Sequence, residues 1–190
     1  TSTLQQDAGV KFNYNAKRVM GIAQKLYEGI ELADERVGLI TYMRTDSIRL
    51  SDEFVSSAKE FITEKYGKEY YKGVKKSSSK AKNIQDAHEA IRPTDVSRTP
   101  AAMKDSLTRD QFRLYQLIWK RFVASRMKSA KYETTSVKIA AGKYRFQVSA
   151  SKVAFEGFRA VYVEADDEKA VNNVLVKALD ENTVLTKDHF

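Results

Sequence analysis

Residues 38–47 read Gly-Leu-Ile-Thr-Tyr-Met-Arg-Thr-Asp-Ser and place a tyrosine at the end of a short apolar stretch. The run from Leu39 to Tyr42 predicts a strand or an extended turn. Arg44 would then project to the same side as Tyr42. A cation held there favours the phenolate, and it could also bind phosphate oxygens. Taken alone, such a pair is more often an ordinary surface tyrosine beside a surface arginine.

The sequence around this stretch predicts helices that begin at capping residues and end at glycine or a polar turn. They run from Ser2 or Thr3 to about Phe12, from Asn13 or Asn15 to Gly29, from Ser51 to Gly67, and from Thr108 to about Met127. Thr108 and Gln111 form a capping box for the last of them. The buried face of this helix is predicted to comprise Phe112, Tyr115, Ile118, Trp119, Phe122 and Val123.

After Lys128 the hydrophobic pattern changes to a period of two, which indicates strands. Val137 and Ile139 alternate with polar residues, and Ala141-Gly142 is a candidate hairpin turn. Further strands are predicted at 158–163 and 183–186. An acidic segment from Glu31 to Glu35 leads to Gly38. Residues 72–82, with five lysines and three serines, are predicted to form a loop, either a phosphate-contacting arm or an ordinary surface loop.

Charge and composition narrow the class of protein. The net charge is +8, and residues 129–190 hold nine Lys or Arg and nine Asp or Glu, so the whole excess lies in residues 1–128. A basic half indicates either a polyanion partner or a basic solvated surface. The absence of cysteine excludes disulfides and thiolate sites. There is no apolar run of membrane length, and Thr1 in place of Met suggests a piece of something longer.

Four segments, in order, resemble type IA DNA topoisomerases. Residues 38–47 resemble the active-site signature of that family, and the methionine after the tyrosine resembles its bacterial topoisomerase I branch. The other three segments are Thr-Ser-Thr-Leu-Gln-Gln at 1–6, Ala-His-Glu-Ala-Ile-Arg-Pro-Thr-Asp at 87–95, and Leu-Tyr-Gln-Leu-Ile-Trp at 114–119. The resemblance covers essentially the whole chain. It implies an α+β fold, with a mainly helical, winged-helix-like gate domain at 1–128 and a partial antiparallel β segment of the arch domain at 129–190.

The resemblance also implies a mechanism. Tyr42 would attack one DNA strand to form a 5′-phosphotyrosyl bond, DNA would pass through the break, and the free 3′-hydroxyl would reverse the step without ATP. Arg44 would hold the phosphate, and His88 would act as a donor to phosphate or assist the leaving or attacking oxygen. The expected further DNA contacts are Thr41, Thr45, Asp46, Ser47 and Arg92. Arg92 could equally be a salt-bridge partner of Glu89 or Asp95.

Several parts of the family are missing from these residues. The catalytic acids and Mg²⁺ of the full-length enzyme would lie in a Toprim domain outside this chain, so no metal site is expected here; Asp166-Asp167-Glu168 is expected to be a turn. The resemblance implies a monomeric cytoplasmic enzyme, associated with the bacterial nucleoid, that acts on single-stranded and negatively supercoiled DNA and not on membranes. The segment from Gly29 to Gly38 resembles a loop lengthening found in part of the family. The fragment alone is expected to be inactive.

Three other readings remain open on the sequence. A non-catalytic helical DNA-binding module accounts for the charge asymmetry but not for four ordered motifs. A tyrosine recombinase or a replication-initiator nuclease would need clustered arginines and histidines, whereas this chain has two histidines. A fold-only domain without a site is the third.

Overall fold

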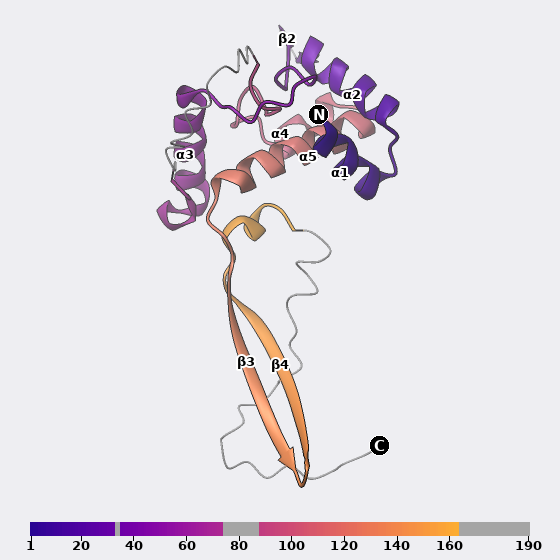
Figure 1. Cartoon of the computed structure of the whole chain (residues 1–190). Coiled ribbons are helices and arrows are strands. Elements are labelled where there is room, and N and C mark those ends of the chain that lie inside the picture. The colour runs from indigo at the N-terminus through magenta and orange to yellow at the C-terminus, as the bar shows by residue number, and fades with distance from the viewer. Residues whose placement is uncertain (33–34, 74–87, 164–190) are drawn as a thin grey trace, which may run out of the picture. The chain divides into compact units, whose positions relative to one another are not determined.

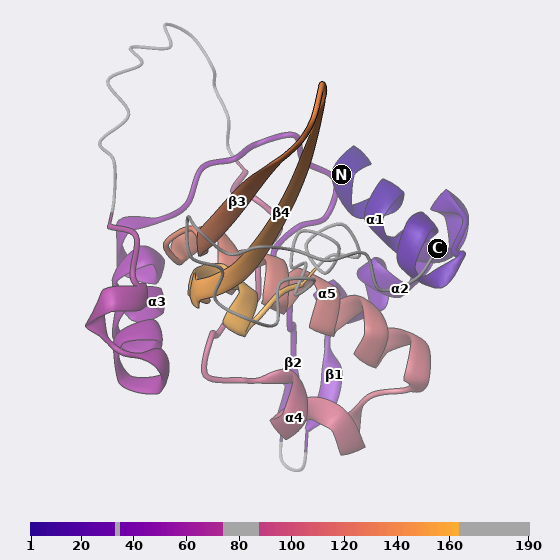
Figure 2. The same ribbon diagram turned by 90° about the horizontal axis from the view of Figure 1, so that it is seen from below.

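The computed structural model describes residues 1–32, 35–73 and 88–163, which form an α+β structure (Figures 1 and 2). Packing divides the chain into two units. The first contains residues 1–129 and 157–162, and the second contains residues 130–156. The predicted α+β class is confirmed in this general form, while the assignment of 1–128 to a winged-helix-like gate domain and 129–190 to an arch domain stays a prediction.

The helices of the first unit begin where local capping predicts them. They are α1 (Ser2–Phe12), α2 (Ala16–Glu28), α3 (Asp52–Tyr66), the short α4 (Pro100–Met103) and α5 (Arg109–Arg126). Asn15 accepts a hydrogen bond from the backbone of α2, Ser51 does so for α3, and Thr108 and Gln111 form the predicted capping box of α5. Helix α1 differs from prediction because its N-cap is Thr1, whose side chain makes no capping bond.

Helix α5 forms the centre of the first unit and packs against the other four helices. Its predicted buried face is confirmed except at Phe112, which is only half-buried; Leu114 and Leu117 are buried as well. Two polar groups on this face find backbone partners: Tyr115 Oη donates to Arg98 O at 2.6 Å, and Trp119 Nε1 donates to Val96 O at 3.0 Å. Burial raises the pKa of the Tyr115 phenol. The residues before α4 are thus tied to the core.

Asp110, in the first turn of α5, joins this helix to the start of α2. Tyr14 Oη donates to one of its carboxylate oxygens and the Arg18 guanidinium to the other, each at 2.6 Å. The hydrogen bond from Tyr14 and then that from Arg18 hold the pKa of Asp110 below its usual value. The Asp110 side chain is one-third exposed, so water screens this ion pair and limits its effect on stability.

One sequence prediction in the first unit is wrong, and one acidic segment forms a pairing that the sequence did not specify. In the acidic segment after Gly29, β1 (Ile30–Leu32) pairs antiparallel with β2 (Glu35–Val37). The strand predicted at 158–163 is instead the 3-10 helix η3 (Gly157–Ala160) followed by a turn. Gly157 has φ +52°, and Phe158 N donates to Lys128 O at 2.9 Å, so a tight turn against the end of α5 replaces the extended chain. The remaining elements are the 3-10 helices η1 (Lys68–Tyr70) and η2 (Lys104–Ser106).

The second unit contains one long antiparallel hairpin. Strand β3 (Lys131–Ala141) pairs with β4 (Tyr144–Phe155) along its whole length, which confirms the predicted alternation. The turn lies one residue later than predicted, at 142–143, because Ala141 pairs with Tyr144 and Gly142 takes φ +59°. The strand predicted at 183–186, the turn at 166–168 and all but residues 72–73 of the lysine-rich loop lie outside the described residues. No helix in the described ranges is long and apolar enough to span a membrane.

Gly38 and Gly21 allow a matched test of this packing. A Cβ on Gly38 would lie 2.6 Å from the backbone oxygen of Tyr27, whereas a Cβ on Gly21, within α2, would meet nothing within 4 Å. We expect Gly38→Ala to lower the free energy of unfolding by about 1–3 kcal/mol, because the backbone at Gly38 must move away from Tyr27 of α2. Gly21→Ala should raise it by about 0.5–1 kcal/mol through helix propensity. Urea titration followed by Trp119 fluorescence measures both, and equal effects would contradict the close approach.

Candidate active site

The segment that carries Tyr42 pairs with a second segment far along the chain. Thr41 N donates to Arg92 O at 3.0 Å, and Thr94 N donates to Leu39 O at 3.0 Å. Between these bonds, Ile40 and Pro93 form an isolated antiparallel bridge. On its other side, Leu39 N donates to Leu26 O, at the end of α2, at 2.7 Å. The chain just before Tyr42 is therefore held on both sides by backbone hydrogen bonds.

This pairing brings Tyr42 and His88 together. Their ring centroids lie 5.0 Å apart with an interplanar angle of 35°. Tyr27 contacts the Tyr42 ring edge-on, at a centroid distance of 5.4 Å and an angle of 67°. Tyr42 is half-buried and His88 is exposed, so both rings remain reachable from solvent. A phenol beside an imidazole at an open surface can take part in nucleophilic and proton-transfer chemistry.

Arg44 follows Tyr42 by two residues and is exposed at the surface. The chain bends at Met43 and Arg44 and does not continue as a strand, but burial still alternates: Met43 is fully buried, while Arg44 is exposed. The guanidinium makes no ion pair or hydrogen bond with another residue in the described part of the chain. It is therefore available to bind an anionic ligand.

The loop after Tyr42 is held by Thr1. Thr1 Oγ1 donates to Met43 O at 2.7 Å and accepts a hydrogen bond from Thr45 N at 3.0 Å. Thr45 Oγ1 in turn accepts a hydrogen bond from Ser47 N at 3.0 Å. The hydroxyl of Thr45 is thus turned inward, where it stabilises the loop, while Asp46 is exposed.

A cavity of 370 Å³ opens beside the same loop. Thr45, Asp46 and Ser47 line one side of it, and Arg126 of α5 lines another. Its apolar wall includes Ile118 and Phe122. Tyr42, Arg44 and His88 do not line this cavity. Three of the predicted DNA contacts therefore share a hollow that is separate from the paired rings.

Comparison with known proteins now identifies the chain. A family model described as DNA topoisomerase matches residues 1–189. The chain belongs to the DNA topoisomerase family. It is also similar to a solved structure, the full-length topoisomerase I from Thermotoga maritima, with 46% sequence identity and a TM-score of 0.72. That match covers 85% of this chain and 26% of the other, so this chain spans about a quarter of the length of its relative. The predicted resemblance to bacterial type IA topoisomerase I is confirmed.

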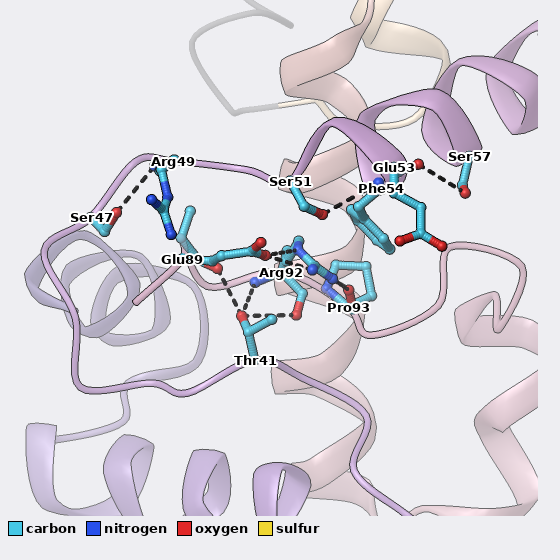
Figure 3. Close-up of polar contacts among 11 residues, drawn as sticks. Thr41, Ser47, Arg49, Ser51, Glu53, Phe54, Ser57, Glu89, Arg92 and Pro93 are labelled. Carbon is cyan, nitrogen blue, oxygen red and sulfur yellow. Dashed lines mark hydrogen bonds and ion pairs between the residues drawn. The ribbon is translucent and has the colours of Figure 1, made fainter. Parts of the chain in front are cut away.

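Arg92 of this topoisomerase chain is engaged inside the protein (Figure 3). Its guanidinium forms an ion pair with Glu89 at 2.5 Å, and Nε donates to the same carboxylate oxygen at 2.7 Å. The guanidinium carbon lies 3.7 Å from the centroid of the Phe54 ring, and only 11% of the side chain is exposed. Of the two ion-pair partners predicted for Arg92, Glu89 is therefore the one that the structure contains. Its role as a phosphate contact stays a prediction.

Sequence reasoning gave no role to two residues of the candidate site. Thr1 fixes the loop after Tyr42, and Tyr27 covers one edge of the Tyr42 ring. Thr1 belongs to the family-like motif at residues 1–6, so that motif could have indicated a role for Thr1. Tyr27 was one of several apolar residues on a helix face, and nothing in that pattern marked it.

A metal ion in a protein is usually held by several side chains together. No group of three or more His, Asp or Glu side chains among the described residues could hold one.

Proposed function

We propose that residues 1–190 are the strand-cleaving part of a type IA DNA topoisomerase and that Tyr42 is its nucleophile. The observation that carries the proposal is the contact between the Tyr42 and His88 rings, in a chain that belongs to the DNA topoisomerase family. Two motifs distant in sequence meet at one accessible spot, as a shared reaction requires.

In the proposed reaction the Tyr42 oxygen attacks the phosphorus of one DNA strand. The bond from phosphorus to the 3′-oxygen of the preceding nucleotide breaks as the phosphotyrosyl bond forms, so the protein stays joined to a 5′ phosphate. The phenol loses its proton, and the departing 3′-oxygen gains one. Religation is the same exchange in reverse. Because the ester keeps the energy of the broken bond, no nucleotide cofactor is required.

Two cationic or hydrogen-bonding groups support this chemistry. His88 lies against the Tyr42 ring and can donate to a phosphate oxygen or to the departing 3′-oxygen. Arg44 has no carboxylate partner among the described residues and can pair with the non-bridging oxygens as negative charge develops there. Both lie at the surface, where a DNA strand can reach them.

The whole reaction is proposed to need parts that lie outside these residues. Strand passage, relaxation of negatively supercoiled DNA and the use of Mg²⁺ belong, in this proposal, to a longer protein. The chain matches about a quarter of the Thermotoga maritima enzyme, which is consistent with that division. The net charge of +8 favours binding of a polyanion by the isolated chain, and the proposed ligand is single-stranded DNA.

A chimera tests the proposal. Residues 1–190 would replace the matching segment of Thermotoga maritima topoisomerase I, and labelled single-stranded oligonucleotide would be added before a denaturing gel. We expect the chimera to form a covalent adduct and the isolated chain to form none. A 3′ label should stay with the protein and a 5′ label should be released, because the ester is to the 5′ phosphate. An adduct that retains only the 5′ label would contradict the proposed polarity of cleavage.

A further inference from the structure

The hydroxyl proton of Thr41 is used inside the protein. It donates to Ala90 O at 2.7 Å and accepts a hydrogen bond from Arg92 N at 2.9 Å (Figure 3). A threonine hydroxyl has one proton to donate, and the carbonyl takes it. The side chain therefore adds hydrogen bonds between the segment at 39–41 and the segment at 90–92, next to the backbone bond from Thr41 N to Arg92 O.

The residues that Thr41 holds belong to the turn that carries His88. Ala90 is bound from both sides, since its N donates to Arg49 O at 2.8 Å while its O accepts from Thr41. Within the same segment, Glu89 forms an ion pair with Arg92, which packs on Phe54. Residues 88–92 are thus bonded to both Thr41 and Arg49, the two ends of the loop that contains Tyr42.

We infer that Thr41 is a positioning residue, whose hydroxyl holds the turn at 88–92 so that the His88 ring stays against the Tyr42 ring. This rests on the proposed function, because it assigns Thr41 to the internal geometry of that site and not to DNA. His88 is exposed and its ring makes no hydrogen bond with another residue in the described ranges, so the position of the ring depends on its backbone and on the Tyr42 contact.

Nuclear magnetic resonance of the 190-residue chain tests this without any catalysis. The chain has two histidines, His88 and His189, so a His189→Gln variant assigns the His88 ring signals. In the wild type we expect a nuclear Overhauser effect between the His88 and Tyr42 rings. Thr41→Val keeps the shape of the side chain but removes both hydrogen bonds, and the inter-ring effect should disappear. Thr41→Ser keeps the hydroxyl and should keep the effect.

Thr94→Val is the matched control. Thr94 Oγ1 also bonds a backbone carbonyl across the same pairing, but its partner is Gly38 O, at 2.7 Å, and not a residue of the segment at 88–92. It should leave the inter-ring effect intact. The Trp119 indole signal, whose N–H is bonded to Val96 O, reports whether each variant is folded. If Thr41→Val keeps the ring contact, the inference is wrong. If Thr94→Val or Thr41→Ser loses it, general loosening is the cause and the inference is equally overturned.

The chimera adds a kinetic readout. Displacement of His88 should slow adduct formation at saturating oligonucleotide by about 10- to 100-fold in Thr41→Val, with unchanged affinity for DNA. A DNA-contacting hydroxyl would show the opposite pattern, weaker affinity with an unchanged saturating rate. If the wild-type chimera forms no adduct, the proposed function fails, while the ring contact in the isolated chain still decides the role of Thr41.

Discussion

Tyr42→Phe, introduced into the chimera, should reduce the 5′-linked DNA adduct to below detection. The substitution removes the one oxygen that forms the ester with phosphate, and no neighbouring group can replace it in the same geometry. Tyr42 Oη makes no hydrogen bond with another described residue, so its removal leaves no unpaired partner. The ring remains and keeps its contacts with Tyr27 and His88. The free energy of unfolding should therefore change by less than about 0.5 kcal/mol.

Tyr27→Phe is the control for this result. Tyr27 lies beside Tyr42, carries the same phenol and is 41% exposed, so it is the alternative nucleophile nearest to the site. Its variant should form the adduct at close to the wild-type level. Denaturing gels with a 3′-labelled oligonucleotide measure both variants. If Tyr42→Phe still forms the adduct, or if Tyr27→Phe loses it, the nucleophile is a residue other than Tyr42 and the proposed function of Tyr42 is wrong.

Leu39→Ala should lower the free energy of unfolding of the first unit by about 2–5 kcal/mol. Leu39 is 0% exposed, three residues before the proposed nucleophile, and its backbone joins α2 to the segment at 92–94. Truncation leaves a cavity that these hydrogen-bonded segments cannot readily close. The loss is a large fraction of the total stability of a domain, and it would loosen the support beneath Tyr42.

Ile48→Ala is the matched control, because Ile48 carries an aliphatic side chain of similar size but is 92% exposed. We expect its effect to stay within about 0.5 kcal/mol. Urea unfolding followed by Trp119 fluorescence reports on the unit that holds both residues. A loss below about 1 kcal/mol for Leu39→Ala would mean that this position is less tightly packed than the structure indicates.

The helices were predictable because their signals are local. Asn15, Ser51 and the pair Thr108–Gln111 cap helices within a few residues of themselves, and each is found where the sequence placed it. The buried face of α5 likewise follows from a period that any helix imposes on its own sequence. The strand prediction that failed depends on a distant partner. The strand predicted at 158–163 is replaced by η3, because the chain at Gly157 turns against Lys128, just after α5.

The sequence by itself determined the family, the α+β class and the candidate residues Tyr42, Arg44 and His88. Motifs and helix caps depend on residues that are close together in the sequence, so they can be recognised without the structure. Only the tertiary structure decided that the Tyr42 and His88 rings touch, that Arg92 pairs with Glu89 against Phe54, and that the Thr41 hydroxyl spans the two segments. Each of these depends on long-range backbone pairing between residues 39–41 and 90–94. Such pairing depends on the packing of the whole core. The residues around a side chain in the sequence therefore do not predict which distant carbonyl or carboxylate it will bind.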